Sequence, residues 1–566
     1  MTEFKKNQEV TVTIDDLGKD GEGIGHIDGY ALFIKDALPT ETVRAKIMKT
    51  KKNYGYARLV EILHESPERM TPKCQSARAC GGCTLQHVSY AEQLRFKESK
   101  VLNCLSRIGG VDLSKVEVLP ILGMDNPWHY RNKAQFPVRM GKNGKPVVGF
   151  YAGRTHSVIP VTDCGIQDES MKEILETVLS VMEREHISAY DEESHTGLIR
   201  HIFIRKGFAT GEIMVCLIIN GSFRNFADRY AEPLQSALTA IDGVTGILLN
   251  VNREKTNVIM GAYTQVLWGK DTITDYIGNI RYEISARSFY QVNPLQTVKL
   301  YETALAFAGL SGGETVWDMY CGIGTISLFL ASSVGEEGRV LGVEIVPEAI
   351  ANARRNAELN NIHNVEFFCG AAEEVVGSVE VCNRVGEAGM KADVVVVDPP
   401  RKGCDRTLLD TICKMAPSKI VYVSCDPATL ARDVKILRSG SSGVCYEVKK
   451  VRACDMFPQG GHVECVVKLS LKKDTPKIEV TMEPDEESNY TPEEKATYQK
   501  IKDYVKDKYG VNVHTSYIAQ VKRMCGLDMG ENYNKSKKEN PEVKQCPQEK
   551  VEYIKDALRY YGLINM

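Results

Sequence analysis

Two side chains that can react lie beside apolar runs in the last third of the chain. Cys425 directly follows residues 420–423, a run with the composition of a buried strand, and Glu464 begins another apolar stretch. A thiolate is a strong nucleophile that can leave again afterwards. A lone carboxylate in an apolar place has a raised pKa and so suits proton abstraction. The two residues are therefore a candidate nucleophile and a candidate general base.

This pair of groups fits methyl transfer to carbon 5 of uracil. Carbon 5 is too poor a nucleophile to take a methyl group directly, so another nucleophile must first add to carbon 6. Cys425 would form that adduct, and Glu464 would then remove the proton from carbon 5 so that the thiol can be eliminated. The alternatives are an inert buried cysteine and a paired structural acid. The place of Cys425 at the end of a strand favours the reactive interpretation.

The elements around these residues predict a doubly wound α/β sheet. Between about residues 286 and 470, apolar strands alternate with helical stretches, which is the pattern of that fold. The strand at 314–318 runs through Tyr320 and two glycines into an apolar helix. Glycines at such a turn let the backbone approach a ligand closely. A generic nucleotide-binding loop would have the same pattern.

Two more strand ends carry acids. The strand at 340–344 ends at Glu344, which is placed to hold a ribose through its hydroxyls. The strand at 394–397 ends at Asp398, on the sheet edge where ligands bind in open α/β folds. A carboxylate that only caps the next helix is the alternative for Asp398. Arg401 occupies the place where enzymes that methylate adenine amino groups carry an aromatic residue, which argues against that chemistry.

Three cysteines share one short loop, and a fourth cysteine follows at a distance. Cys74, Cys80 and Cys83 form the loop cluster, and Cys164 could complete a set of four thiolates. Four thiolates suit either a zinc ion or an iron-sulfur cluster, and the spacing alone does not decide between them.

The remaining segments predict a multidomain chain. Short alternating strands with glycine turns over 1–63 favour a small OB-like β-barrel, and its basic strip with Tyr54 and Tyr56 could follow an RNA backbone or be only a solvated hairpin. Residues 64–285 indicate a mixed α+β domain, 471–490 an acidic linker and 491–566 a small helical extension.

Composition bounds the class of protein. The chain has 566 residues, too many for one core, with 43% hydrophobic and 26% charged residues, as in ordinary soluble proteins. We expect a cytoplasmic monomer without membrane association, because we find no apolar run of spanning length and no secretion signal. Most of its 17 cysteines should then be reduced thiols. A net charge of -3 means that RNA binding must rest on local basic patches.

The combination of motifs resembles the RNA uracil-5-methyltransferase family. The segments that carry the resemblance are 289–293 (FYQVN), 318–324 (DMYCGIG), 398–403 (DPPRKG), 424–433 (SCDPATLARD) and 462–465 (HVEC). The resemblance implies that Gln291, Tyr320, Glu344 and Asp398 bind S-adenosylmethionine or line its site. It further implies that Cys425 is the nucleophile and that Glu464 is the base.

The resemblance extends to the first half of the chain and covers about residues 1–470. Residues 7–63 look like a TRAM domain, an RNA-binding barrel, and the cationic residues of the motif at 128–134 (WHYRNKA) match a family motif expected to face RNA. Ribosomal RNA members of the family carry a [4Fe-4S] cluster on the cysteine pattern of 74–83, whereas members acting on tRNA generally lack it. The resemblance therefore implies a cluster on Cys74, Cys80, Cys83 and Cys164, structural or RNA-positioning in role, and 23S rRNA as the substrate.

Three rival functions remain at this point. The first is a tRNA uracil-5-methyltransferase, and the second is a catalytically silent RNA-binding or ribosome-assembly factor. The third is an RNA cytosine-5-methyltransferase, which also attacks carbon 6 with a cysteine. Cytosine enzymes usually carry a Pro-Cys nucleophile, whereas this chain has Ser424 before Cys425, so uracil is favoured.

Overall fold

The computed structural model describes residues 4–153, 155–376, 391–440, 444–472, 498–525 and 546–561, with single residues between these ranges. Contacts divide the chain into two units, 1–481 and 482–566. From residue 473 onward, the expected acidic linker lies outside the described residues. Among the residues described, no helix has the length and apolar character that crossing a membrane requires.

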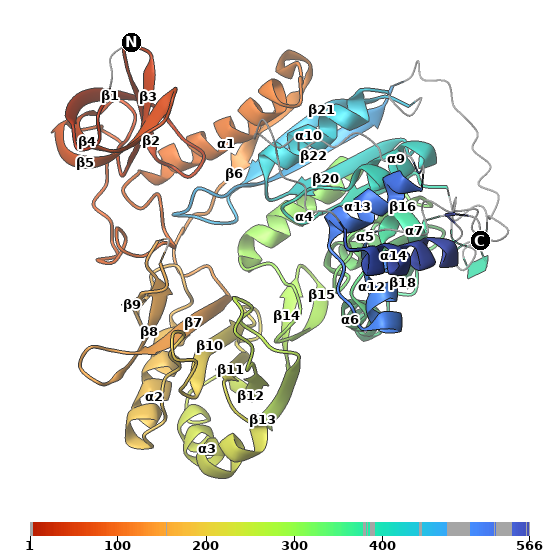
Figure 1. Ribbon diagram of the computed structural model, residues 1–566. Coiled ribbons are helices and arrows are strands. Elements are labelled where there is room, and N and C mark those ends of the chain that lie inside the picture. Colours follow the sequence, from red (N-terminus) through yellow and green to blue (C-terminus); the bar gives the residue numbers. More distant parts are fainter. Residues whose placement is uncertain are drawn as a thin grey trace. The chain divides into compact units, whose positions relative to one another are not determined.

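The first segment of unit one is a closed five-stranded barrel with the strand order β1-β2-β3-β5-β4 (Figure 1). Alternate residues such as Val12 and Ile14 point into its core together with Leu32, Ile34 and Val43. This alternation buries one face of every strand, as a small barrel requires, and confirms the expected barrel. The strands are β1 (Glu9–Leu17), β2 (Gly23–Ile27), β3 (Tyr30–Lys35), β4 (Thr42–Thr50) and β5 (Tyr54–His64).

A second sheet has seven strands in the order β13-β12-β11-β10-β7-β8-β9. One face packs against helices α2 (Ser170–Arg184) and α3 (Phe223–Leu238), while Phe203, Met214 and Cys216 on the other face join the core of the next sheet. Strands buried on both faces tie the two layers into one body. The strands are β7 (Lys133–Met140), β8 (Pro146–Tyr151), β9 (Val158–Pro160), β10 (Ile199–Lys206), β11 (Ile213–Ile219), β12 (Val244–Val251) and β13 (Tyr263–Gly269).

The third sheet has eight strands in the order β18-β17-β16-β19-β20-β22-β21-β6. Strands β16 to β20 are parallel, and β22 runs antiparallel between β20 and β21. Chain order reverses between β16 and β19, which makes this point the switch point where ligands bind in such folds. The strands are β16 (Thr315–Asp318), β17 (Arg339–Glu344), β18 (Val365–Cys369), β19 (Val394–Val397), β20 (Lys419–Ser424), β21 (Tyr446–Cys454) and β22 (Glu464–Leu471).

Helices and a short hairpin surround this third sheet. The hairpin, β14 (Thr272–Ile277) with β15 (Ile280–Ser285), packs into the same core as the sheet. The helices are α4 (Pro294–Ala308), α5 (Thr325–Ala331), α6 (Pro347–Leu359), α7 (Ala372–Val375), α9 (Arg406–Met415) and α10 (Pro427–Arg438).

Residues 90–122 join the third sheet, although the sequence pattern assigned them to the central segment 64–285. Helix α1 (Tyr90–Arg107) packs on α10, and β6 (Glu117–Leu122), after the short 3-10 helix η1 (Leu113–Lys115), pairs in parallel with β21. A local pattern predicts a strand but does not identify the strand that it pairs with, and this explains the difference.

Helix α1 holds the loop that leads into β22. The buried Lys97 ammonium lies 2.5 Å from Oδ1 of buried Asp455, and the Tyr90 hydroxyl donates to Oδ2 of the same acid at 3.0 Å. Further along the loop, the Gln459 backbone N–H donates to the Gln93 side chain at 3.0 Å. These buried bonds fix the loop at 455–461, and with it the start of β22.

Unit two contains three described helices, α12 (Tyr498–Tyr509), α13 (Thr515–Met524) and α14 (Gln548–Tyr560). Their apolar faces share a core that includes Ile501, Ile518 and Ile554. On α14, Asp556 accepts hydrogen bonds from Tyr504, Lys508 and Tyr509 of α12, so charged and aromatic groups also link these two helices.

Replacing Lys97 with Met should lower the free energy of unfolding by about 3–5 kcal/mol, because Asp455 would be left buried without its cation. Adding Asp455→Asn should recover much of this loss, since the unpaired charge is then removed. Denaturant titration followed by circular dichroism measures both effects. Lys115→Met, which breaks only the exposed pair with Asp112, is the control. Equal losses for Lys97→Met and Lys115→Met would mean that the buried pair does not hold α1.

Candidate functional site

The register between β20 and β22 brings Cys425 and Glu464 together. Ser424 at the end of β20 pairs with Cys465 on antiparallel β22, so the next residue on each strand is Cys425 on one side and Glu464 on the other. Asp398 follows β19, the neighbour of β20 on its other side. Three reactive groups that are far apart in the sequence therefore meet at one sheet edge.

Glu464 is a buried acid with one unsatisfied oxygen. Glu464 is only 3% exposed, and its Oε2 has no hydrogen-bond partner within the described structure. Burial raises the pKa of Glu464 well above its ordinary value, and the nearby Asp398 raises it further, while Arg401 opposes the shift. Buried polar atoms normally have partners. This oxygen can therefore take a proton or a hydrogen bond from a bound substrate.

Cys425 is half-buried and holds its proton in this state. Burial first, then Glu464 and Asp398, raise the pKa of its thiol to about 11, while Arg401 lowers it. The turn that carries it is fixed, because Asp426 caps α10 by accepting the backbone N–H groups of Ala428 at 2.9 Å and Thr429 at 3.1 Å. Protonation of Glu464 or Asp398 would remove a charge that raises this pKa and would therefore favour the thiolate.

Cys425 opens into a cavity of about 870 Å³ within unit one. Its lining includes barrel residues 16–20, a face of α1, residues 425–428 and residues 460–463, together with Gly81, Gly82 and Thr84 of the cysteine loop. Four cationic side chains outnumber three carboxylates there; the cations are Lys19, Lys100, Arg107 and Arg401, and the acids are Asp16, Asp20 and Asp426. A cavity with an excess of cations can accept a nucleobase together with its anionic phosphate backbone.

Lys100 binds the barrel to the loop before Glu464. Its Nζ donates to the backbone oxygen of Lys19 at 2.9 Å and to that of Gly461 at 2.7 Å. The Lys19 ammonium in turn lies 3.7 Å from Asp426. No pattern in the sequence indicates Lys19 or Lys100, because each is one lysine among many and lies hundreds of residues from Cys425.

A cluster of aromatic rings on the barrel begins in the wall of this cavity. Phe33 lines it, and the rings of Phe33, Tyr54 and Tyr56 have mutual centroid distances of 5.7 Å. Tyr54 is 37% and Tyr56 is 40% exposed, so both offer ring faces to solvent. This arrangement suits the stacking of unpaired bases.

The turn after β16 has the geometry of a close backbone approach. Gly322 and Gly324 have φ values of 55° and 83°, and a Cβ on Gly324 would lie 3.0 Å from the Phe367 ring. Buried Asp318 accepts a hydrogen bond from Ser327 at 2.6 Å, and burial raises its pKa to about 6. Only glycine fits the turn without strain.

Three of the four expected cofactor residues lie at the ends of neighbouring strands of the third sheet. Asp398 is within electrostatic range of Cys425 and Glu464, and burial, followed by Asp318, raises its pKa to about 7. Tyr320 follows β16 and Glu344 is the last residue of β17, both at the same edge, and Oε1 of Glu344 accepts the Val346 N–H at 3.0 Å.

Gln291 lies just before α4, and Tyr301, which sequence analysis missed, lies on this helix. Gln291 is buried just before this helix, where its backbone oxygen accepts from Asn132 at 3.0 Å, and it does not line the cavity of Cys425. Tyr301 on α4 donates to Thr325 at 2.9 Å. Burial and then Asp398 raise the pKa of Tyr301, so its ring lies among the acids of the site.

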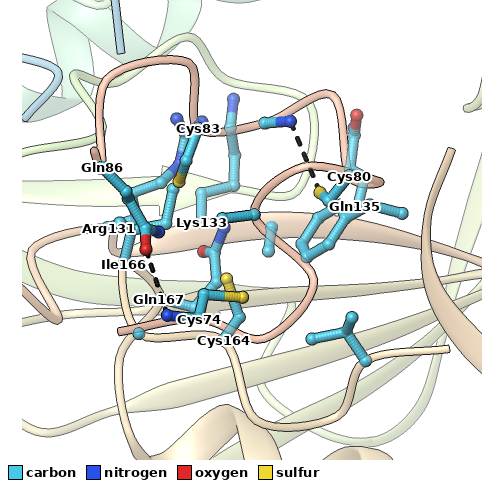
Figure 2. A pocket seen from close by; sticks show the side chains of 16 residues that line it. Cys74, Cys80, Cys83, Gln86, Arg131, Lys133, Gln135, Cys164, Ile166 and Gln167 are labelled. Carbon is cyan, nitrogen blue, oxygen red and sulfur yellow. Dashed lines mark hydrogen bonds between the residues drawn. The ribbon is translucent and has the colours of Figure 1, made fainter. Parts of the chain in front are cut away.

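A second cavity, of about 270 Å³, is lined by all four expected cysteines, Cys74, Cys80, Cys83 and Cys164 (Figure 2). Burial, opposed by a hydrogen bond with Gln86 and assisted by the other three sulfurs, raises the pKa of Cys83 to about 12, so Cys83 lies within electrostatic range of the other three. Within the described residues, no three His, Cys, Asp or Glu side chains converge as the ligands of one metal ion do. The thiols instead surround the cavity.

The motif at 128–134 supplies part of this cavity. Arg131 and Lys133, which the sequence led us to expect at an RNA-facing surface, line the cysteine cavity (Figure 2). The Arg131 N–H donates to the Ile166 backbone oxygen at 3.0 Å, which holds this segment beside the turn of Cys164. That these two cations also face RNA stays a prediction.

Comparison with known proteins agrees with this geometry. The family model described as tRNA (uracil-5-)-methyltransferase matches residues 89–472, and the TRAM domain model matches residues 3–60. An uncharacterised RNA methyltransferase of Listeria innocua is 50% identical over 469 residues, 83% of this chain and 99% of that protein. One of Clostridium acetobutylicum is 48% identical over 464 residues, 82% and 97% of the two chains.

A solved structure is similar over the same part of the chain. The tRNA (uracil-54, C5)-methyltransferase of Pyrococcus abyssi, in complex with S-adenosyl-L-homocysteine, is 30% identical with a TM-score of 0.64. The match covers 81% of this chain and 99% of that one. The chain therefore belongs to the family of RNA uracil-5-methyltransferases and carries a TRAM domain.

Proposed function

We propose that this enzyme transfers a methyl group from S-adenosylmethionine to carbon 5 of a uridine in 23S rRNA, through a covalent bond between Cys425 and carbon 6. The observation that carries the proposal is the pairing of β20 with β22, which sets the thiol beside a buried acid with an unpartnered oxygen.

Each residue has a distinct part in the proposed cycle. The Cys425 thiolate adds to carbon 6, and the resulting enolate at carbon 5 takes the methyl group of S-adenosylmethionine, with the thioether of that cofactor as leaving group. Glu464 then takes the proton from carbon 5, and the electron pair of that bond expels the thiolate. A raised pKa makes Glu464 a strong enough base for this step and lets it release the proton later.

We propose that the cofactor lies at the carboxyl edge of β16, β17 and β19. Tyr320, Glu344 and Asp398 follow these strands, and the glycine turn between β16 and α5 leaves room for a ligand close to the backbone. Gln291 is proposed to complete the site. The similar enzyme of Pyrococcus abyssi was solved with S-adenosyl-L-homocysteine, the product of such a transfer, which supports this assignment.

We further propose a [4Fe-4S] cluster on Cys74, Cys80, Cys83 and Cys164. A cluster holds its thiolates around a core of iron and sulfide and so keeps them farther apart than one ion would. Four thiols around a common cavity, with no carboxylate in its lining, fit that donor set. The cluster would join the loop of 74–83 to the central sheet and is given no part in the methyl transfer.

A tRNA substrate is the alternative, and the similarity to a tRNA (uracil-54, C5)-methyltransferase favours it. The cysteine set and the resemblance to ribosomal RNA enzymes favour 23S rRNA. Mapping of 5-methyluridine in cells with and without the gene tests both. Loss of a methyl group from 23S rRNA with intact tRNA supports the proposal, whereas loss only from tRNA refutes the rRNA assignment. Loss from neither would leave the silent binding factor as the better reading.

Glu464→Gln should accumulate a protein-RNA adduct that resists denaturing gel electrophoresis, because the methyl group is transferred but the carbon 5 proton stays on. Cys425→Ala should bind the same labelled RNA and form no adduct. Cys413→Ala, at a buried cysteine on α9, should turn over like the wild type. Wild-type turnover by Glu464→Gln without a trapped band would show that another group is the base.

The reactivity of Cys425 without RNA should rise steeply with pH. With a pKa of about 11, its thiolate fraction and its alkylation by iodoacetamide should grow about tenfold per pH unit from about pH 7 to about pH 10. In Glu464→Gln the curve should move to lower pH, because a negative charge that raises this pKa is gone. Mass spectrometry of the Cys425 peptide measures the rate. An unshifted curve would mean that the two groups do not interact.

Anaerobically purified protein should be yellow-brown and hold about four iron atoms per chain. Cys80→Ala should lose that iron and its absorbance while S-adenosylmethionine binding, followed by calorimetry, is retained, since none of the residues proposed to bind the cofactor lines the cysteine cavity. Stoichiometric zinc in a colourless protein would refute the cluster.

A further inference from the structure

Two cationic side chains line the cysteine cavity without an acid beside them. Arg131 and Lys133 both contribute to its wall, and neither forms an ion pair within the described part of the chain. The Arg131 Nε is buried without a hydrogen-bond acceptor there, and Oε1 of Gln167 in the same wall is buried without a donor. Other enclosed cations of unit one have acceptors. Arg69 and Lys206 pair with carboxylates, whereas buried Arg200 and Arg205 donate to backbone oxygens.

An enclosed cation without an acid requires another source of negative charge, since burial of unpaired charge is costly. The cavity itself can supply it. Four thiolates around an oxidised [4Fe-4S] core carry a net charge of about −2, and one-electron reduction makes it about −3. Two cations would balance the net charge of the oxidised cluster and would favour its reduction by one electron.

We propose that Arg131 and Lys133 are the counter-cations of the iron-sulfur cluster and set its reduction potential. The inference rests on the proposed cluster. Backbone geometry keeps Arg131 in place, because its N–H and C=O bond to Ile166 and Asp168, on the segment that follows Cys164. Lys133 begins β7, two residues further along, and so lines the same wall.

The experiment compares charge-removing with charge-keeping variants of the holoenzyme. Arg131→Gln and Lys133→Met should each lower the midpoint potential in a dithionite titration by the equivalent of about a tenfold change in the reduction equilibrium, about 59 mV for one electron. Arg131→Lys and Lys133→Arg should stay close to the wild type. Lys145→Met, which removes a lysine that pairs with Glu183 at 2.8 Å away from the cavity, is the matched control.

The outcomes separate this inference from the cluster proposal. A wild-type protein without iron refutes the cluster and the inference with it. A full cluster whose potential is unchanged in Arg131→Gln and Lys133→Met refutes the inference alone; weaker RNA binding with a smaller salt dependence in these variants would then assign both cations to phosphate. If Arg131→Gln assembles no cluster, Arg131→Lys must restore iron and potential, and its failure to do so refutes a role of charge.

Discussion

The site depends on a carboxylate that is kept buried and unpaired beside a thiol. Burying Glu464 with an open oxygen costs stability, because neither water nor a protein group compensates it. The same burial gives the acid the raised pKa that proton abstraction requires. Strand β22 runs antiparallel between β20 and β21. Its hydrogen-bonded register with β20 sets Glu464 next to Cys425.

Everything that holds the start of β22 therefore contributes to the position of the proposed base. The buried bonds of Lys97 and Gln93 on α1 fix the loop at 455–461. Lys100 on the same helix extends this hold to the barrel, whose loop at 16–20 forms one wall of the cavity of Cys425. The barrel and the third sheet thus line the same cavity, and Lys100 on α1 bonds to both the barrel and the loop before β22.

The sequence predicted those features that local patterns determine. Alternating strands indicated the barrel, and apolar runs followed by Asp398 and Cys425 located reactive groups at the carboxyl edge of a parallel sheet. Pairing between distant segments was beyond it. The register of β20 with β22 joins segments tens of residues apart, and the attachment of α1 and β6 to the third sheet joins segments hundreds of residues apart. The contacts of Lys100 with the barrel and with the loop before β22 were likewise beyond local patterns.

The central claim is that Cys425 forms a covalent bond to carbon 6 of the target uridine. RNA with 5-fluorouridine at the target position tests it most directly, because fluorine at carbon 5 cannot be abstracted as a proton and elimination is blocked. Mass spectrometry after nuclease and protease digestion should find the methylated fluorouridine nucleotide on the Cys425 peptide, in the presence of S-adenosylmethionine. Attachment at another cysteine, or stable methylated RNA without any protein adduct, would contradict this account.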